Sequence, residues 1–130
     1  MITEVYNPTR VACLRDGLQL EDSVIKAYLI DTDDYTFSLS HASLASVPLA
    51  ARVSEVEVEG IVVTPDGKVL SDTLLFTSVN GDRFESLILY NETLDLLLCH
   101  CMAEAPIDPD GGNVEVACPA DGWLSLTSIA

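Results

Sequence analysis

The chain has 130 residues, of which 48% are hydrophobic and 6% aromatic, and its 21 acidic and 6 basic side chains give a formal net charge of −15. This length predicts one domain, residues 1–130, with a core of Val, Leu and Ile that needs no disulfide or metal. The charge argues against nucleic acid as a partner, because binding phosphates depends on Lys and Arg. No apolar run approaches the roughly 18 residues of a membrane span, so we expect no membrane partner. Glu4 stands where a secretory signal needs basic residues, which indicates folding in the cytoplasm.

A short helix is predicted near the N-terminus, from Pro8 to about Asp16. Asn7 suits the N-cap, Pro8 the first helical position, and Gly17 a C-terminal stop. The apolar stripe of this helix would comprise Val11, Ala12, Leu14 and Leu18. So short a helix is not stable alone, so we expect it to pack on its own domain. The alternative is an arm that docks on a neighbouring subunit.

The stretch Ser23–Asp31 predicts the first full strand of a sheet. Alternation places Ile25, Ala27 and Leu29 on one face, and Val24, Lys26, Tyr28 and Ile30 on the other. A strand that is nearly apolar on both faces is usually central or covered.

Weaker patterns follow the acidic turn Asp31–Asp34. Tyr35–Leu39 alternates and predicts a short strand, and Ser40–Ser46 predicts one helical turn capped by Ser40. His41 has no other histidine and no nucleophile close in sequence. We interpret it as a surface histidine with satisfied hydrogen bonds.

The clearest alternation in the chain lies within Arg52–Val63. Glu55, Glu57 and Glu59 alternate with valines, which predicts a strand with one wet and one buried face. The three carboxylates would lie about 6 to 7 Å apart along the strand, so one small ion could not be chelated by all three. We therefore interpret them as a solvated face that could also serve as a protein interface.

Turn residues predict two hairpins. The run Thr64–Lys68, TPDGK, would join the preceding strand to a partner that begins at Lys68. Asn80-Gly81 would join Leu74–Val79 to Phe84–Tyr90 as a second hairpin, because Asn-Gly is a strong signal for a tight turn.

The remaining stretch completes an antiparallel domain. Thr93–Met102 predicts a buried strand, with a helix as the alternative, and Ala105–Asn113 predicts an exposed loop. Val114–Ala117 and Trp123–Thr127 predict short strands. The spacing of strands and turns, without repeat or linker, predicts a mainly β domain: a single antiparallel β-sandwich or barrel-like fold with one short N-terminal helix.

Cys99-His100-Cys101 resembles a fragment of a metal site, with Cys13 and Cys118 as distant ligands. Zinc sites usually have two spaced pairs of ligands. On a strand, the two cysteines also face away from His100. We interpret the cysteines as small buried apolar residues and expect no metal, no cofactor and no disulfide.

Two acidic loops, Asp31–Asp34 and Asp108–Asn113, have residues that bind calcium but lack the spacing and the closing glutamate of an EF-hand. Asp, Asn and Gly are also ordinary turn formers, so calcium binding is left open. No phosphate loop, nucleophile elbow or catalytic histidine pair is found, so we expect no enzyme and no catalytic residues.

Three aromatic residues could anchor an interface, because aromatic side chains are enriched there. We assign Trp123 to the core, and leave Tyr6 and Phe37 open between core and interface.

The order of several sequence segments is similar to that of a known group of proteins. A helix after NPTR leads to a glycine, DSVIKAYLIDTDDY and SVPLAARV, and later come NGDRFESLILY and PDGGNVEV. From Asn7 to Val116 the chain resembles small β-rich virion structural proteins of tailed bacteriophages. It departs from them at Cys99-His100-Cys101 and at Cys118. These segments are structural and include no active site.

The resemblance implies a virion location after synthesis in the host cytoplasm. It implies other virion proteins as partners, either the major capsid protein or tail proteins, and a homo-oligomer is compatible with it. A capsid decoration or cement protein is the first interpretation, and a tail, neck or fibre component is the alternative. A small tail-associated carbohydrate-binding or hydrolytic module is the third, and it would need paired carboxylates in a cleft.

Overall fold

A five-stranded antiparallel sheet forms the centre of the protein in this computed structural model, which describes residues 2–15, 17, 20–120 and 122–125. Its strand order is β1-β8-β7-β2-β3. In that order the strands are Ile2–Val5, Leu96–Ile107, Phe84–Asn91, Ile25–Ile30 and Arg52–Glu57. The strand β2 confirms the predicted strand Ser23–Asp31, and it lies between β7 and β3.

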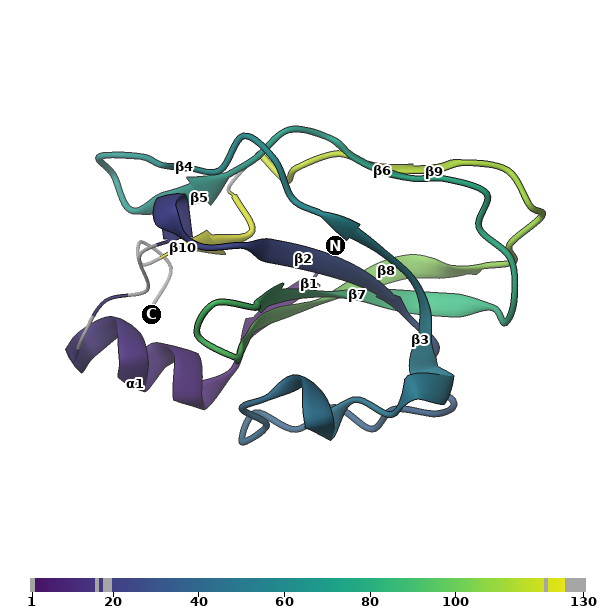
Figure 1. Ribbon diagram of the computed structural model, residues 1–130, viewed down its shortest axis with the longest axis horizontal. Helices are drawn as coiled ribbons and strands as arrows, with labels where there is room; N and C mark the ends of the chain where they lie inside the picture. The colour runs from purple at the N-terminus through teal and green to yellow at the C-terminus, as the bar shows by residue number, and fades with distance from the viewer. Residues whose placement is uncertain (1, 16, 18–19, 121, 126–130) are drawn as a thin grey trace.

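Two smaller antiparallel sheets lie over one face of the large sheet, and the helix α1 lies beside it (Figure 1). The three-stranded sheet has the order β10-β5-β4, and the two-stranded sheet pairs β6 with β9. Their bounds are Leu124–Ser125, Lys68–Leu70, Val62–Val63, Leu74–Phe76 and Val114–Val116. The pairing of β4 with β5 confirms the hairpin predicted around Thr64–Lys68. A mainly β, antiparallel fold with one helix near the N-terminus is therefore confirmed.

The large sheet has a hydrophobic core on each face. The first core lies toward the small sheets and includes Ile25, Ala27 and Leu29 together with Trp123, whose side chain is fully buried. The second core lies on the opposite face and includes Tyr28 with Ile30, Tyr6, Tyr35, Val47, Ala51, Ile88, Tyr90 and Leu97. The predicted division of β2 into two faces is confirmed, and so is the core position of Trp123. Tyr6 also belongs to a core.

The second core is covered by residues 32–51, called the cover segment below (Figure 1). This segment contains two short 3-10 helices, η2 at Leu44–Ser46 and η3 at Leu49–Ala51. The predicted strand Tyr35–Leu39 is wrong, because these residues form no ladder with another strand in the described structure. Leu39 O accepts a single hydrogen bond from Asn7 N at 2.7 Å. The helical turn predicted over Ser40–Ser46 is observed only at its end, as η2 at Leu44–Ser46. Its N-cap is Ser43 and not Ser40, and Ser43 forms no side-chain capping bond.

The predicted hairpin between Leu74–Val79 and Phe84–Tyr90 is wrong. The strand β6 pairs with β9, whereas β7 pairs with β2 and β8. The loop between β6 and β7 is held to the loop before β9 instead, since Val79 N donates to Gly112 O and Gly111 N donates to Val79 O. The apolar strand β7 is buried on both faces, which a two-stranded hairpin cannot provide.

The strand β7 forms its hairpin with β8. Leu94 N donates to Asn91 Oδ1 at 3.0 Å in the turn, and Asp95 has a φ of 54°. The prediction of a buried strand at Thr93–Met102 is confirmed, although β8 begins at Leu96 and extends to Ile107. The predicted loop Ala105–Asn113 therefore begins later than expected.

The helix α1 spans Asn7–Arg15 and matches the predicted position. Its predicted apolar stripe is wrong: the side chain of Leu14 is 87% exposed and that of Val11 is 45% exposed. Thr9 is the buried residue of the helix, and its hydroxyl donates to Leu97 O at 2.6 Å. Leu18 lies outside the described residues.

The last two predicted strands are shorter than expected. Val114–Ala117 corresponds to β9, and Trp123–Thr127 corresponds to β10, whose described part is Leu124–Ser125. The remainder of the latter prediction lies outside the described residues.

Candidate functional site

Three acidic loops meet at one end of the protein. Arg83 lies in the loop between β6 and β7, and Asp108 lies in the loop between β8 and β9. Arg83 Nε donates to Asp108 Oδ1 at 2.7 Å, and a terminal guanidinium nitrogen donates to Asp108 Oδ2 at 3.2 Å. The hydrogen bond and charge of Asp108, and then the charges of Glu85 and Asp33, raise the pKa of Arg83. The two loops that the sequence singled out for calcium are therefore neighbours around Arg83.

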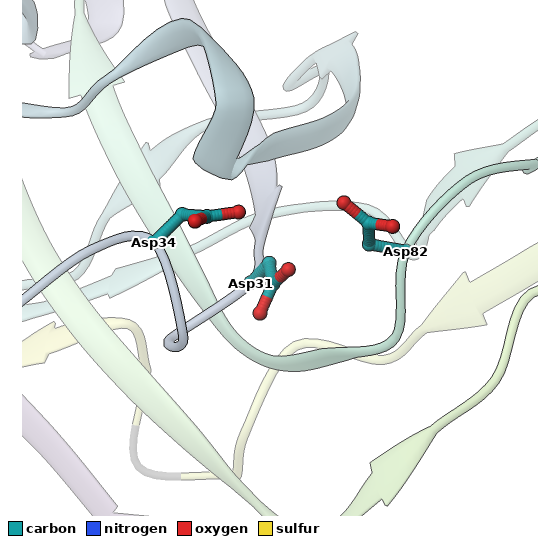
Figure 2. Close-up of side chains that lie close together, drawn as sticks. All are labelled: Asp31, Asp34 and Asp82. Carbon is teal, nitrogen blue, oxygen red and sulfur yellow. The ribbon is translucent and has the colours of Figure 1, made fainter.

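Three aspartates form a candidate metal centre at this end. Asp31, Asp34 and Asp82 each place one carboxylate oxygen within 4.8 Å of the others (Figure 2). Asp31 is buried at the end of β2, while Asp34 and Asp82 are exposed. Partial desolvation, and then the charges of Asp31 and Asp82, raise the pKa of Asp34. Three carboxylates suit a hard cation such as calcium, which takes 6–8 oxygen ligands, so water or backbone would supply the rest.

The sequence indicated two members of this group and missed the third. Asp31 and Asp34 lie in one short turn, and Asp31 Oδ1 accepts the backbone N–H of Asp33 at 2.9 Å. Asp82 comes from a different loop that reaches this turn only because β7 pairs with β2. The predicted partner of β7 was β6, so no local signal placed Asp82 here.

Several side-chain oxygens of the second calcium candidate, Asp108–Asn113, form hydrogen bonds within the protein. Asp108 binds Arg83, and Asp110 Oδ1 accepts Gly112 N at 2.9 Å. Asn113 Oδ1 accepts Ser78 N at 3.1 Å. These bonds fit the interpretation of this loop as a turn.

The structure places Cys99, His100 and Cys101 on β8 with alternating direction, as predicted. The two cysteines lie in the first core, and His100 is buried on the opposite face of the sheet. Thr3 Oγ1 donates to Cys101 Sγ at 3.5 Å. Hydrogen bonding with Cys101, together with burial, raises the pKa of Cys99, which favours its neutral thiol.

Glu55, Glu57 and Glu59 are exposed, as predicted, whereas Val56 and Val58 pack toward the first core. The first two belong to β3, which is an edge strand of the large sheet, and Glu59 follows it. Lys26 Nζ lies 3.8 Å from Glu55 Oε2 and 3.3 Å from Glu92 Oε2. Among the described residues, no cation forms an ion pair with Glu57 or Glu59.

A chain of hydrogen bonds crosses the second core. Tyr6 OH lies 2.8 Å from Tyr35 OH, and Tyr35 OH lies 2.9 Å from His41 Nδ1. His41 is half-buried and hydrogen-bonded, so the predicted satisfied histidine is confirmed, although its position is less exposed than expected. Burial and hydrogen bonding between the tyrosines raise the pKa of Tyr6, which favours its neutral phenol.

The other histidine, His100, is 4% exposed, and its Nε2 has no hydrogen-bond partner in the described part of the chain. Ser86 Oγ is likewise buried without a partner among these residues. Ser86 pairs with Met102 in the register, two residues along the strands from the pair Ile88 and His100. The two unpaired groups therefore lie on the same face of adjacent strands.

No helix within the described residues is both long enough and apolar enough to span a bilayer. No protein-family model matches the chain, and a comparison with curated proteins gives no match. The candidate sites are therefore interpreted from their own chemistry.

Proposed function

We propose that this chain is a structural protein of a tailed-bacteriophage virion that acts by binding other virion proteins and catalyses nothing. A capsid decoration or cement protein, seated on the lattice of the major capsid protein, is the form that we favour. The observation that carries the proposal is the row of exposed glutamates along the edge strand β3. The setting comes from the resemblance of the chain to small phage structural proteins.

The edge strand offers two kinds of contact. An edge strand has unpaired backbone groups that can bind an added strand, and charged side chains on it select the partner. Glu57 and Glu59 form no ion pair within the described structure, so a basic surface would complement them. Charged edges also discourage strands from pairing between copies. With a net charge of −15, two copies repel at this face, which favours a different protein as the partner.

Exposed apolar side chains provide a second contact. Leu14 on α1 and Leu49 at the start of η3 are 87% and 79% exposed. Interfaces combine apolar contact at the centre with polar groups at the rim. A decoration protein that lies flat on a shell would have surfaces of both kinds, as this chain has.

The interface is tested by attachment to particles. Glu57→Lys should lower occupancy, because it places a positive charge in a face that binds a basic surface. Glu115→Lys is the matched control, since Glu115 is also an exposed strand residue but lies on β9. Exposed substitutions usually change stability by less than about 0.5 kcal/mol, so both variants should fold.

A second variant, Glu57→Gln, separates loss of charge from repulsion by Lys26. Lys26 lies directly opposite Glu57 on β2, so a lysine at position 57 introduces local repulsion as well. Glu57→Gln removes the charge without that repulsion and should lower occupancy less. Unchanged occupancy with both substitutions would remove this face from the interface.

A tail, neck or fibre component is the alternative, and the large sheet has a second edge, at β1, that could join a neighbouring protein. Hundreds of copies per virion would indicate a shell protein, while multiples of three, six or twelve would indicate the tail or neck. Particles that lack a cement protein should release DNA at a lower temperature. Loss of a tail component should leave heads stable while adsorption or assembly fails.

The third candidate, a tail-associated carbohydrate-binding or hydrolytic module, is favoured by one observation. Asp31 and Asp34 each place a carboxylate oxygen within 4.8 Å of the other, and such a module needs a pair of carboxylates. Hydrolysis of host cell-surface polysaccharide that is lost in Asp34→Asn would support this candidate. Absence of any such hydrolysis would leave the structural role.

A further inference from the structure

We propose that acidification releases the cover segment, residues 32–51, from the large sheet while the first core remains folded, and that protonation of His100 drives this release. The inference is independent of the proposed function. His100 lies on β8 between the sheet and the cover segment.

The ring of His100 is enclosed by aromatic side chains of the cover segment. Phe37 stacks on it, with ring centroids 4.7 Å apart and planes inclined by 22°. The ring of Tyr35 lies 6.0 Å away, centroid to centroid. The imidazole is 4% exposed, and its Nε2 has no protein partner among the described residues. A proton added to Nε2 would therefore place a charge without an acceptor in an apolar site.

One carboxylate lies near this site: Glu4 on β1 is directly opposite His100 in the register, but its side chain is exposed and does not bond to His100 Nε2. The other titratable groups are these. The cover segment contributes Tyr35 and His41, and the turn before α1 contributes Tyr6, all joined in one hydrogen-bonded chain. From the sheet, β2 and β7 contribute Tyr28 and Tyr90 to the same core. A guanidinium, that of Arg52, lies 6.0 Å from the Tyr28 ring. No carboxylate belongs to the buried set of this core.

Burial alone lowers the pKa of His100 from 6.5 to about 4. Because this pKa is lower in the closed protein, neutral His100 stabilises the closed state relative to the open one, and protonation removes this stabilisation. This contribution is complete above pH 6.5, and it is lost as the pH falls toward 4. Lifting the cover segment removes Phe37 and Tyr35 from the ring and lets water reach it. The open state therefore has the ordinary, higher affinity for the proton.

The cover segment can open separately because single hydrogen bonds and side-chain packing, rather than a ladder of backbone bonds, hold it on the sheet. Backbone bonds join it to the rest of the chain at Leu97 N–Ala42 O (2.8 Å), Asn7 N–Leu39 O (2.7 Å) and Asp31 N–Ala51 O (2.8 Å). Side-chain bonds add the tyrosine chain, the Arg52 guanidinium on the carbonyls of Leu44 and Val47, and Thr32 Oγ1 on Glu85. It forms no sheet ladder in the described structure. Regions with few backbone bonds are the ones that open locally. The first core lies on the other face of the sheet and contains no histidine among its buried residues.

Hydrogen exchange, corrected for the intrinsic pH dependence of exchange, tests the proposal. The amide of Leu97 reports on the cover segment, and the amide of Val58, bonded to Ile25 O at 2.8 Å, reports on the sheet. If His100 acts alone, the opening constant should rise about 20-fold between pH 7 and pH 5 for a shift between pKa values of 6.5 and about 4. Val58 and the fluorescence of the buried Trp123 should change little over this range.

His100→Phe keeps an aromatic ring but cannot be protonated, so the increase at Leu97 should disappear. His100→Gln serves the same purpose if the phenylalanine variant fails to fold. His41→Asn is the control and should keep the increase, because His41 is half-buried and hydrogen-bonded. The proposal is overturned if Leu97 and Val58 lose protection together, or if a folded variant without His100 opens as the parent does.

Discussion

Arg83 and Asp108 form a two-pronged ion pair that joins the loop after β6 to the loop after β8. The same loops exchange backbone hydrogen bonds between Val79, Gly111 and Gly112. These contacts lie next to the ladder in which β6 pairs with β9. The ion pair therefore closes the end of the two-stranded sheet. Asp82, next to Arg83 in the chain, lies beside Asp31 and Asp34 (Figure 2).

Replacing Arg83 should change the titration of its partner. The hydrogen bond from Arg83, and then its charge, lower the pKa of Asp108. Arg83→Gln should raise this pKa toward the ordinary value, as measured by NMR of the carboxyl carbon. A lowered folded-state pKa favours folding above the ordinary value and loses that effect as the pH falls, so the variant should be less sensitive to acid. Asp66 is the control, because its pKa is lowered chiefly by a hydrogen bond from Thr64.

Replacing Asp82 should change the titration of Asp34 in the opposite direction. The charge of Asp82 is one of the causes that raise the pKa of Asp34. Asp82→Asn removes this charge, and the pKa of Asp34 should move down toward its ordinary value. A titration of Asp34 that is the same in both proteins would show that the two carboxylates do not interact in solution.

Local patterns in the sequence predicted the elements that depend on neighbouring residues. Alternation identified both faces of β2 and the wet and buried faces of β3, and the turn residues Thr64–Lys68 identified the β4–β5 hairpin. Cys99 and Cys101 were also correctly separated from His100, because strand periodicity is a local property.

Nonlocal pairing was outside the reach of those patterns. Asn80-Gly81 predicted a tight turn, but Ser78 has a φ of 50° and the loop turns to meet residues 110–113. The partner of β6 is β9, far along the chain, and no turn signal encodes such a pairing. Asp82 was missed for the same reason. The cover segment was misread because Tyr35 and Phe37 alternate to pack on His100 and Tyr6, without forming a ladder.

Two leucines should differ sharply in their contribution to stability. Leu89 on β7 is 1% exposed in the first core, whereas Leu14 on α1 is 87% exposed. Leu89→Ala should lower the free energy of unfolding by about 2 to 5 kcal/mol through the lost burial and the cavity. Leu14→Ala should change it by less than about 0.5 kcal/mol. Denaturant unfolding measures both. A large loss at Leu14 would mean that this side chain packs on the domain, as the sequence had suggested.

The hydroxyl of Thr9 should matter more to the fold than any apolar side chain of α1. It is buried and donates to Leu97 O at 2.6 Å, and Leu97 N in turn donates to Ala42 O in the cover segment. Thr9→Val keeps the shape of the side chain but removes this donor from a buried carbonyl, at a cost of about 1 to 3 kcal/mol. Thr36→Val is the control, because Thr36 is exposed and should change stability by less than about 0.5 kcal/mol. Since the bond joins α1 to β8 beside the attachment of the cover segment, hydrogen exchange at Leu97 should also become faster in Thr9→Val. Equal unfolding free energies for the two variants would show that α1 is not fastened to the sheet through this hydroxyl.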